Sequence, residues 1–137
     1  MAAPLDLLKR VPLFQGLDDK HLKRISQAFT ERPFANGQDL VTEGSGGVGF
    51  FVIENGEARV TVEGEPRREL GPGDYFGEIA LIDGGLRTAT VTATSDGRMH
   101  GLTSWQFRPL VEDNASIAWP LLEAMAKRTR ELEQHSH

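Results

Sequence analysis

Apolar residues repeat with a helical period at both ends of the chain and with a period of two in the middle. Residues 1–31 therefore predict N-terminal helices, and residues 104–134 predict C-terminal helices. Between them, residues 32–103 predict a series of short strands. No internal repeat or linker-like stretch interrupts the sequence. We therefore expect one domain, residues 1–137, that is mainly β with flanking helices.

The N-terminal stretch predicts two helices. Leu22 and Ile25 share one face of the second helix. Asp18 or Asp19 stands where a carboxylate can cap the first N–H groups of that helix. Pro12 separates the two helices, because a proline interrupts the helical hydrogen-bond ladder.

Turn residues divide the middle region into short strands. The candidates are residues 39–41, 49–53, 58–62, 67–70, 88–94 and 99–103. Asn55-Gly56 and Asp96-Gly97 each stand between two candidates, and such pairs favour two-residue hairpin turns. The turn spacing predicts about seven or eight short strands in all, these six candidates included, which is typical of a sandwich or jelly roll.

The C-terminal stretch predicts a short helix and a longer final helix. Residues 105–111 form the first, and we expect Pro109 to bend it. Asn114 can cap the final helix, and Pro120 marks its first turn, where proline is well tolerated. The final helix carries an apolar stripe that offers a surface for self-association, formed by Ile117, Leu121, Met125 and Leu132.

Composition excludes several classes of protein. A hydrophobic content of 39% is too high for a disordered chain. No apolar run approaches the ~20 residues that span a bilayer. A formal net charge of −5 argues against bulk binding to nucleic acid or to an anionic membrane. The sequence has no cysteine, which excludes disulfides and thiolate metal sites, and we expect a cytoplasmic location.

Residues 74–91 lie between two strand candidates but do not read as an ordinary hairpin loop. Residues 79–82 can form one helical turn, whose first N–H groups can face an anion. Gly77 lets the backbone approach a ligand, and the planar fork of Arg87 suits two phosphate oxygens. Glu78 cannot serve a phosphate, and its natural partner is a sugar hydroxyl. Phosphate and ribose on one loop indicate a nucleotide.

The run Phe-Gly-Glu-Ile-Ala-Leu at residues 76–81, followed by Arg-Thr-Ala at residues 87–89, resembles the phosphate-binding cassette of cyclic nucleotide-binding domains. This family includes the regulatory subunit of protein kinase A, cyclic-nucleotide-gated channels and the catabolite activator protein. Supporting similarity extends over residues 12–17, 50–57 and 70–78. The resemblance implies an eight-stranded β roll, or double-stranded β-helix, with its cassette at residues 76–89 and a C-terminal lid helix.

The resemblance also implies roles for particular residues. Arg87 would clamp the exocyclic oxygens of the cyclic phosphate, and Glu78 would accept from the ribose 2′-hydroxyl. Val60 would pack against the purine, while Met125, Arg128 or Leu132 of the lid would contact the base. The complete set of predicted nucleotide-binding residues is Val60, Phe76, Gly77, Glu78, Ile79, Ala80, Arg87, Thr88, Ala89, Met125 and Arg128.

One position departs from the pattern. Some relatives place an aspartate that holds the cassette arginine where this chain has Val48. This difference motivates an alternative, a ligand-free β-roll module that keeps the fold and binds proteins. The favoured interpretation is a non-enzymatic sensor that binds cAMP in preference to cGMP. Its output would pass to an effector protein in trans or through self-association of the final helix.

A third interpretation is a metal enzyme of the cupin type, which shares the jelly-roll architecture. Such a site needs clustered histidines and carboxylates on the strands, whereas the strand region holds only His100. No nucleophile–base arrangement stands out either. We therefore expect no metal and no catalysis.

Overall fold

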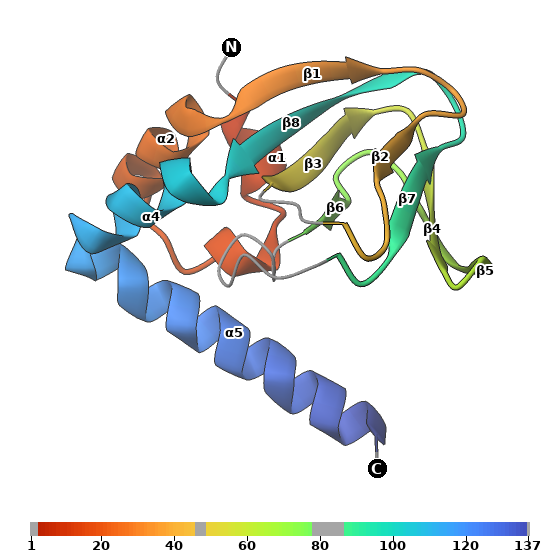
Figure 1. The fold of residues 1–137 in the computed structure, drawn as a ribbon. Coiled ribbons are helices and arrows are strands. Elements are labelled where there is room, and N and C mark those ends of the chain that lie inside the picture. Colours follow the sequence, from red (N-terminus) through yellow and green to blue (C-terminus); the bar gives the residue numbers. More distant parts are fainter. Residues whose placement is uncertain (1–2, 46–48, 78–86, 137) are drawn as a thin grey trace.

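Eight short strands form two four-stranded antiparallel sheets in the computed structural model, which describes residues 3–45, 49–77 and 87–136 (Figure 1). The first sheet has the order β1 (Thr30–Phe34), β8 (Gly97–Thr103), β3 (Gly49–Asn55), β6 (Tyr75–Phe76). The second has the order β2 (Asp39–Val41), β7 (Thr90–Ala93), β4 (Ala58–Val62), β5 (Glu65–Leu70). This topology confirms the predicted eight-stranded β roll with flanking helices.

Alternation along β3 divides the interior into two hydrophobic clusters. Phe50 and Val52 point out of the roll into a cluster with the helices. Phe51 and Ile53 point into a second cluster between the two sheets. Both faces of the strand are covered, which explains why the sequence from 49 to 53 is continuously apolar rather than alternating.

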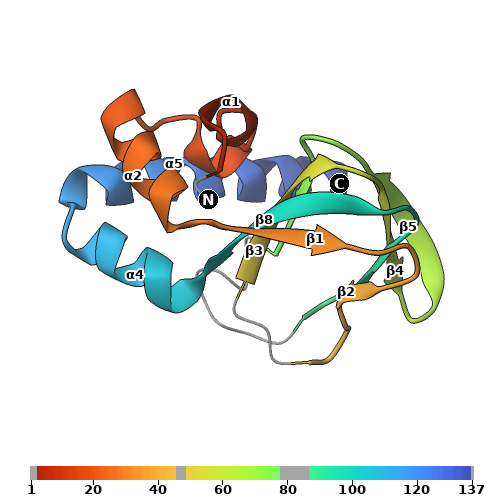
Figure 2. The same cartoon turned by 90° about the horizontal axis from the view of Figure 1, so that it is seen from above.

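The helices pack on the outer face of the first sheet, where Figure 2 shows them gathered on one side of the roll. Their bounds are α1 (Leu5–Leu8), the 3₁₀ helix η1 (Pro12–Phe14), α2 (Asp19–Ala28), α4 (Ser104–Glu112) and α5 (Ala115–Ser136). The side chain of Asp18 accepts from the N–H of His21 at 2.9 Å, which confirms the predicted cap of α2.

The two predicted hairpins at Asn55-Gly56 and Asp96-Gly97 are wrong. β3 and β8 belong to one sheet and β4 and β7 to the other, so the chain crosses between sheets at both places. The crossings lie against each other, and a Cβ on Gly56 would lie 2.7 Å from the carbonyl oxygen of Asp96. β3 pairs with β8 in one sheet, and β4 pairs with β7 in the other. The two pairs form a continuous ribbon that bends at this corner, where a side chain in place of Gly56 would clash.

The real two-residue hairpin joins β4 to β5 at Glu63-Gly64. Both residues have positive φ, 53° and 81°, which is the twist that matches two antiparallel strands. Pro66 follows within β5, which is an edge strand, where a missing N–H costs no ladder bond. The gap between the strand candidates 58–62 and 67–70 is therefore a turn, but a shorter one than predicted, because β5 begins at Glu65.

The end of the chain differs from the prediction at one proline. α5 begins at Ala115, so Pro120 lies inside the helix rather than in its first turn. Just before α5, the side chain of Asn114 donates to the carbonyl of Leu110 and accepts from Arg24, both at 2.9 Å. These bonds fix the corner between α4 and α5, so the helix starts earlier than a proline-based boundary suggests.

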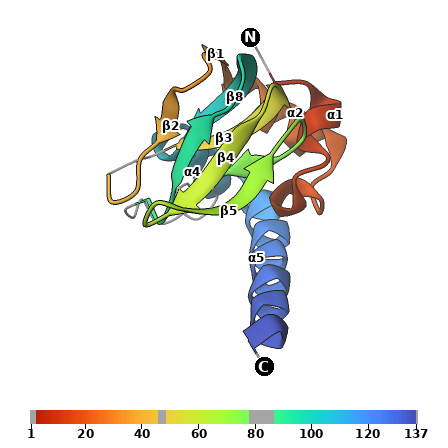
Figure 3. The same ribbon diagram turned by 90° about the vertical axis from the view of Figure 1, so that its right-hand side faces the viewer.

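The apolar residues of α5 also divide differently from the predicted stripe. Ile117 and Leu121 are buried in the helical cluster, so this half of the stripe is not available to a second copy. The exposed large apolar residues of the helix are Trp119, Leu122 and Leu132. Figure 3 shows that the C-terminal part of α5 extends away from the body of the molecule.

Candidate functional site

Arg87 is one of the few charged side chains buried in the described structure, with 7% of its surface exposed. Backbone bonds fix its position: its N–H donates to Ser45 at 3.0 Å, and its carbonyl accepts from Gly44 at 2.9 Å. Its Nη2 donates to the carbonyl oxygen of Gly49 at 2.6 Å. The Nε of Arg87 is buried and has no hydrogen-bond partner among the described residues.

Gly77 makes room for this guanidinium. Its φ is +91°, a conformation that side chains rarely adopt. A Cβ at this position would lie 2.6 Å from Nη1 of Arg87 and 2.6 Å from the carbonyl oxygen of Gly49. The sequence predicted that Gly77 brings backbone close to a ligand. In the structure it brings backbone close to Arg87.

The guanidinium is held without a compensating negative charge among the described residues. Burial lowers the pKa of Arg87, because desolvation disfavours the charged form. The group stays ionised, since a guanidinium does not lose its proton in proteins. No carboxylate within the described ranges forms an ion pair with it, and its hydrogen bond goes to a neutral carbonyl. An anion would satisfy both the charge and the unpaired Nε.

A cavity of about 430 Å³ borders Arg87, within the range of small-molecule sites. It is lined by β1, β2, β3 and the start of α4, and the side chains include Arg32, Val41, Phe51, Arg87 and Trp105. The sequence did not single out Gly49, Phe51 or Trp105 as site residues. Their only signal was a glycine directly before an apolar strand and a tryptophan directly after one.

The structure brings part of the predicted site together. Phe76, Gly77, Arg87, Thr88 and Ala89 are described, and the rings of Phe76 and Phe51 pack with their centroids 5.2 Å apart. Glu78, Ile79 and Ala80 lie outside the described residues, as does Val48.

Val60 is not beside Arg87. It lies half-buried in β4 and packs on the cluster between the sheets. It is not among the described residues that line the cavity bordering Arg87. Its predicted contact with a purine stays a prediction.

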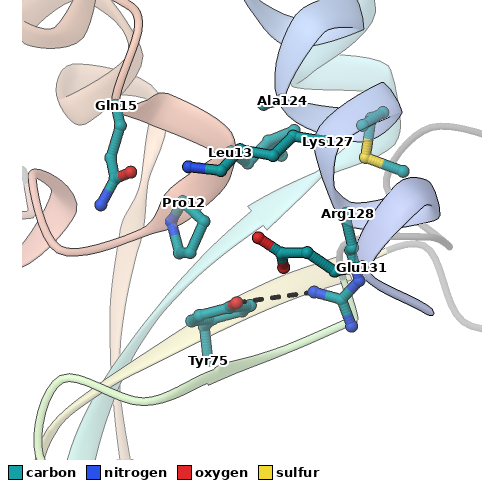
Figure 4. Close-up of a pocket in the computed structure, with 9 residues that line it drawn as sticks. Pro12, Leu13, Gln15, Tyr75, Ala124, Lys127, Arg128 and Glu131 are labelled. Atoms are coloured by element: carbon teal, nitrogen blue, oxygen red, sulfur yellow. Dashed lines mark hydrogen bonds between the residues drawn. The ribbon is translucent and has the colours of Figure 1, made fainter. Parts of the chain in front are cut away.

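Met125 and Arg128 line a different cavity, of about 190 Å³, between η1, β6 and α5 (Figure 4). Pro12, Leu13 and Tyr75 form the facing wall. Nη1 of Arg128 lies 3.5 Å from the hydroxyl oxygen of Tyr75, at the long limit for a hydrogen bond. The structure therefore does not bring these two predicted lid residues to the cavity of Arg87.

The part of the chain that the structure describes shows neither a metal-binding cluster nor a membrane-spanning helix. Within it, no group of three or more histidines and carboxylates is arranged to hold a metal ion. Nε2 of His100 instead lies 2.8 Å from Oε1 of Glu54. No described helix has the length and apolar content required to span a bilayer.

Known proteins share both the sequence pattern and the fold of this chain. A family model described as cyclic nucleotide-binding domain matches residues 31–114. A cAMP-dependent protein kinase regulatory subunit of Yarrowia lipolytica is 41% identical over 88 residues, which cover 63% of this chain and 24% of the relative. The chain spans between 9% and 26% of the lengths of curated relatives that it matches.

Solved structures share the fold. The N-terminal domain of a transcriptional regulator from Streptomyces coelicolor A3(2) has a TM-score of 0.87 and 29% identity, with 96% of each chain covered. The regulatory domain of Toxoplasma gondii PKA, crystallised with cAMP, has a TM-score of 0.71 and 33% identity, with 80% of this chain and 43% of that chain covered.

Proposed function

The chain belongs to the cyclic nucleotide-binding domain family, and on that premise we propose that it is a non-enzymatic sensor of a 3′,5′-cyclic nucleotide. One observation carries the proposal: among the described residues, the buried guanidinium of Arg87 has neither a partner for its Nε nor a carboxylate partner. A cyclic phosphodiester carries one negative charge and two exocyclic oxygens, which match the planar fork of an arginine. Binding would supply the missing counter-charge.

The rest of the nucleotide would be held by residues 76–89. The carboxylate of Glu78 would accept from the ribose 2′-hydroxyl, and the N–H groups of Ala80 and Thr88 would face the phosphate. We propose cAMP in preference to cGMP. The similarity to a cAMP-dependent kinase regulatory subunit and to a PKA regulatory domain crystallised with cAMP supports cAMP as a ligand. A cGMP-dependent protein kinase of Drosophila melanogaster is 38% identical over 96 residues, so the comparison of the two nucleotides is left to the titration below.

Signalling would use the C-terminal helices. Met125 and Arg128 lie against η1 and Tyr75, away from Arg87, so a lid role requires α5 to leave that position. Tyr75 immediately precedes Phe76, so β6 joins the α5 contact to the nucleotide segment. Ligand would favour the closed placement of α5 only by the difference in its affinity for the two placements.

The receiver of the signal would be an effector protein in trans or a second copy of the chain. For self-association, the exposed Trp119 and Leu122 are better placed than the buried Ile117 and Leu121. A cytoplasmic location, the absence of a metal and the absence of direct contact with nucleic acid or membrane remain part of the proposal.

Calorimetric titration with cAMP, cGMP and 5′-AMP tests the proposal. At ~0.3 kcal/mol per atom, a nucleotide of about 22 heavy atoms would bind with a Kd of roughly ten micromolar. We expect saturable binding of cAMP, weaker binding of cGMP and little binding of the open-ring 5′-AMP. Absence of heat with both cyclic nucleotides would favour the ligand-free interaction module instead.

A further inference from the structure

Phe51 contacts two of the backbone elements that hold Arg87. It lies in β3, opposite Gly101 of β8 and Phe76 of β6. A Cβ on Gly49 would lie 2.8 Å from Cζ of Phe51, and a Cβ on Gly101 would lie 2.7 Å from its Cε1. The ring therefore rests directly on the backbone of two glycines.

The first glycine is the one that anchors the guanidinium. The carbonyl oxygen of Gly49 accepts the hydrogen bond from Nη2 of Arg87. The ring of Phe51 occupies the space beside Gly49 that a side chain would fill, so it should restrict the rotation of that peptide group. We expect the direction of the carbonyl, and with it the position of the guanidinium, to depend on this packing.

The second support is the backbone of β6. The ring of Phe76 packs on that of Phe51 at a centroid distance of 5.2 Å and an interplanar angle of 31°. Phe76 directly precedes Gly77, whose missing side chain admits Nη1 of Arg87. One aromatic ring thus braces the guanidinium from the carbonyl side and from the glycine side.

We infer that Phe51 is a positioning residue for the anion site, acting through the backbone of Gly49 and of Phe76–Gly77 to hold Arg87 in place. The inference rests on the proposed function for the identity of the anion. The geometry of Arg87 in the ligand-free protein does not depend on it.

The chain contains a matched control, Phe34. It is buried in the cluster against which the half-buried Phe51 packs, and it also lies beside two glycines: its Cζ lies 2.8 Å from a Cβ built on Gly56 and 2.5 Å from one built on Gly97. Those glycines form the corner between the sheets and make no hydrogen bond to Arg87. Phe34→Leu and Phe51→Leu therefore remove the same kind of packing, but only the second touches the supports of Arg87.

The first readout needs no nucleotide. The Nε–H of Arg87 is buried, so its NMR signal, assigned by its loss in Arg87→Lys, should exchange slowly with water in the ligand-free protein. We expect Phe51→Leu to speed this exchange by about tenfold or more relative to Phe34→Leu, because local opening near Arg87 becomes easier. Equal exchange in the two variants would overturn the inference.

The second readout separates the phosphate from the base. We expect Phe51→Leu to weaken cAMP binding by about tenfold. This is the size of effect expected when a displaced Arg87 no longer makes one of its hydrogen bonds to the phosphate in good geometry. Binding of adenosine, which has no phosphate, should weaken less than binding of cAMP, because Phe51 also lines the cavity, and Phe34→Leu should leave the ratio of cAMP to adenosine affinity as in the parent protein. A ratio unaltered by Phe51→Leu counts against the inference.

Gly101→Ala tests the same contact from the other side. Its new Cβ would meet Cε1 of Phe51 at 2.7 Å without touching Arg87, so it should produce the same two changes even if Phe51→Leu does not fold. If the parent protein binds no cyclic nucleotide, the proposed function fails while the exchange measurement still decides the role of Phe51.

Discussion

Arg87 and His100 are both basic side chains buried in the β roll, but their surroundings differ. Nε2 of His100 lies 2.8 Å from a carboxylate oxygen of Glu54. Arg87 has only the neutral carbonyl of Gly49 among the described residues. Within the part of the chain that the structure describes, each also keeps one buried nitrogen without a partner, Nδ1 of His100 and Nε of Arg87.

On the proposed function, this difference distinguishes a structural role for His100 from a binding role for Arg87. A guanidinium keeps its full charge, so burying Arg87 without a counter-charge among the described residues costs more than burying one unpaired polar nitrogen. A buried charge without a partner destabilises the ligand-free protein and is therefore informative about function. The three predictions below test this contrast.

The largest expected effect is on ligand affinity at Arg87. Arg87→Ala should weaken cAMP binding by ~2–5 kcal/mol, because a buried phosphate would lose its only proposed counter-charge. Titration calorimetry measures the loss. Unchanged affinity in a folded Arg87→Ala variant would remove Arg87 from the site.

The next effect is on stability at His100. His100→Ala should lower the free energy of unfolding by about 2–4 kcal/mol, since it empties a buried site and leaves Glu54 without this partner. Urea denaturation measures the change. Nucleotide affinity should stay near that of the parent, and a parallel loss of affinity would mean that His100 also belongs to the site.

The smallest expected effect is a gain in stability rather than a loss. Arg87→Met keeps an unbranched side chain but removes the buried charge, so the ligand-free protein should become more stable by about 1 kcal/mol. The comparison is made by urea denaturation without nucleotide. A clear loss of stability would show that Arg87 is held mainly for the fold.

Much of the fold could be predicted because it depends on local signals. The cap at Asp18 and the turn after β4 use residues that act on their immediate neighbours. Asn55-Gly56 and Asp96-Gly97 carry the same local signal as a hairpin, yet they form the corner between sheets. Only the pairing of β3 with β8, distant in sequence, distinguishes the two outcomes.

Site residues that are close together in the sequence could be predicted, and those brought together only by the fold could not. Gly77 and Arg87 belong to one motif, and the structure places them in contact. Phe51 was missed because a strand buried on both faces gives no periodicity to say which side chain faces the site. Met125 and Arg128 lie on the predicted helix, but the direction of that helix is set by packing on η1, which the pattern of α5 alone does not encode.

The folded-over ribbon has a consequence for how the molecule assembles. Residues near position 50 must meet residues near position 100 before the first sheet has its central pair, and within the intervening chain β4 must meet β7 before the second sheet has its own. Closing so long a loop has an entropic cost that is met early, so we expect this topology to fold more slowly than a helical bundle of the same length. In the ribosome's exit path, the first half of the roll would emerge with its neighbours still unsynthesised.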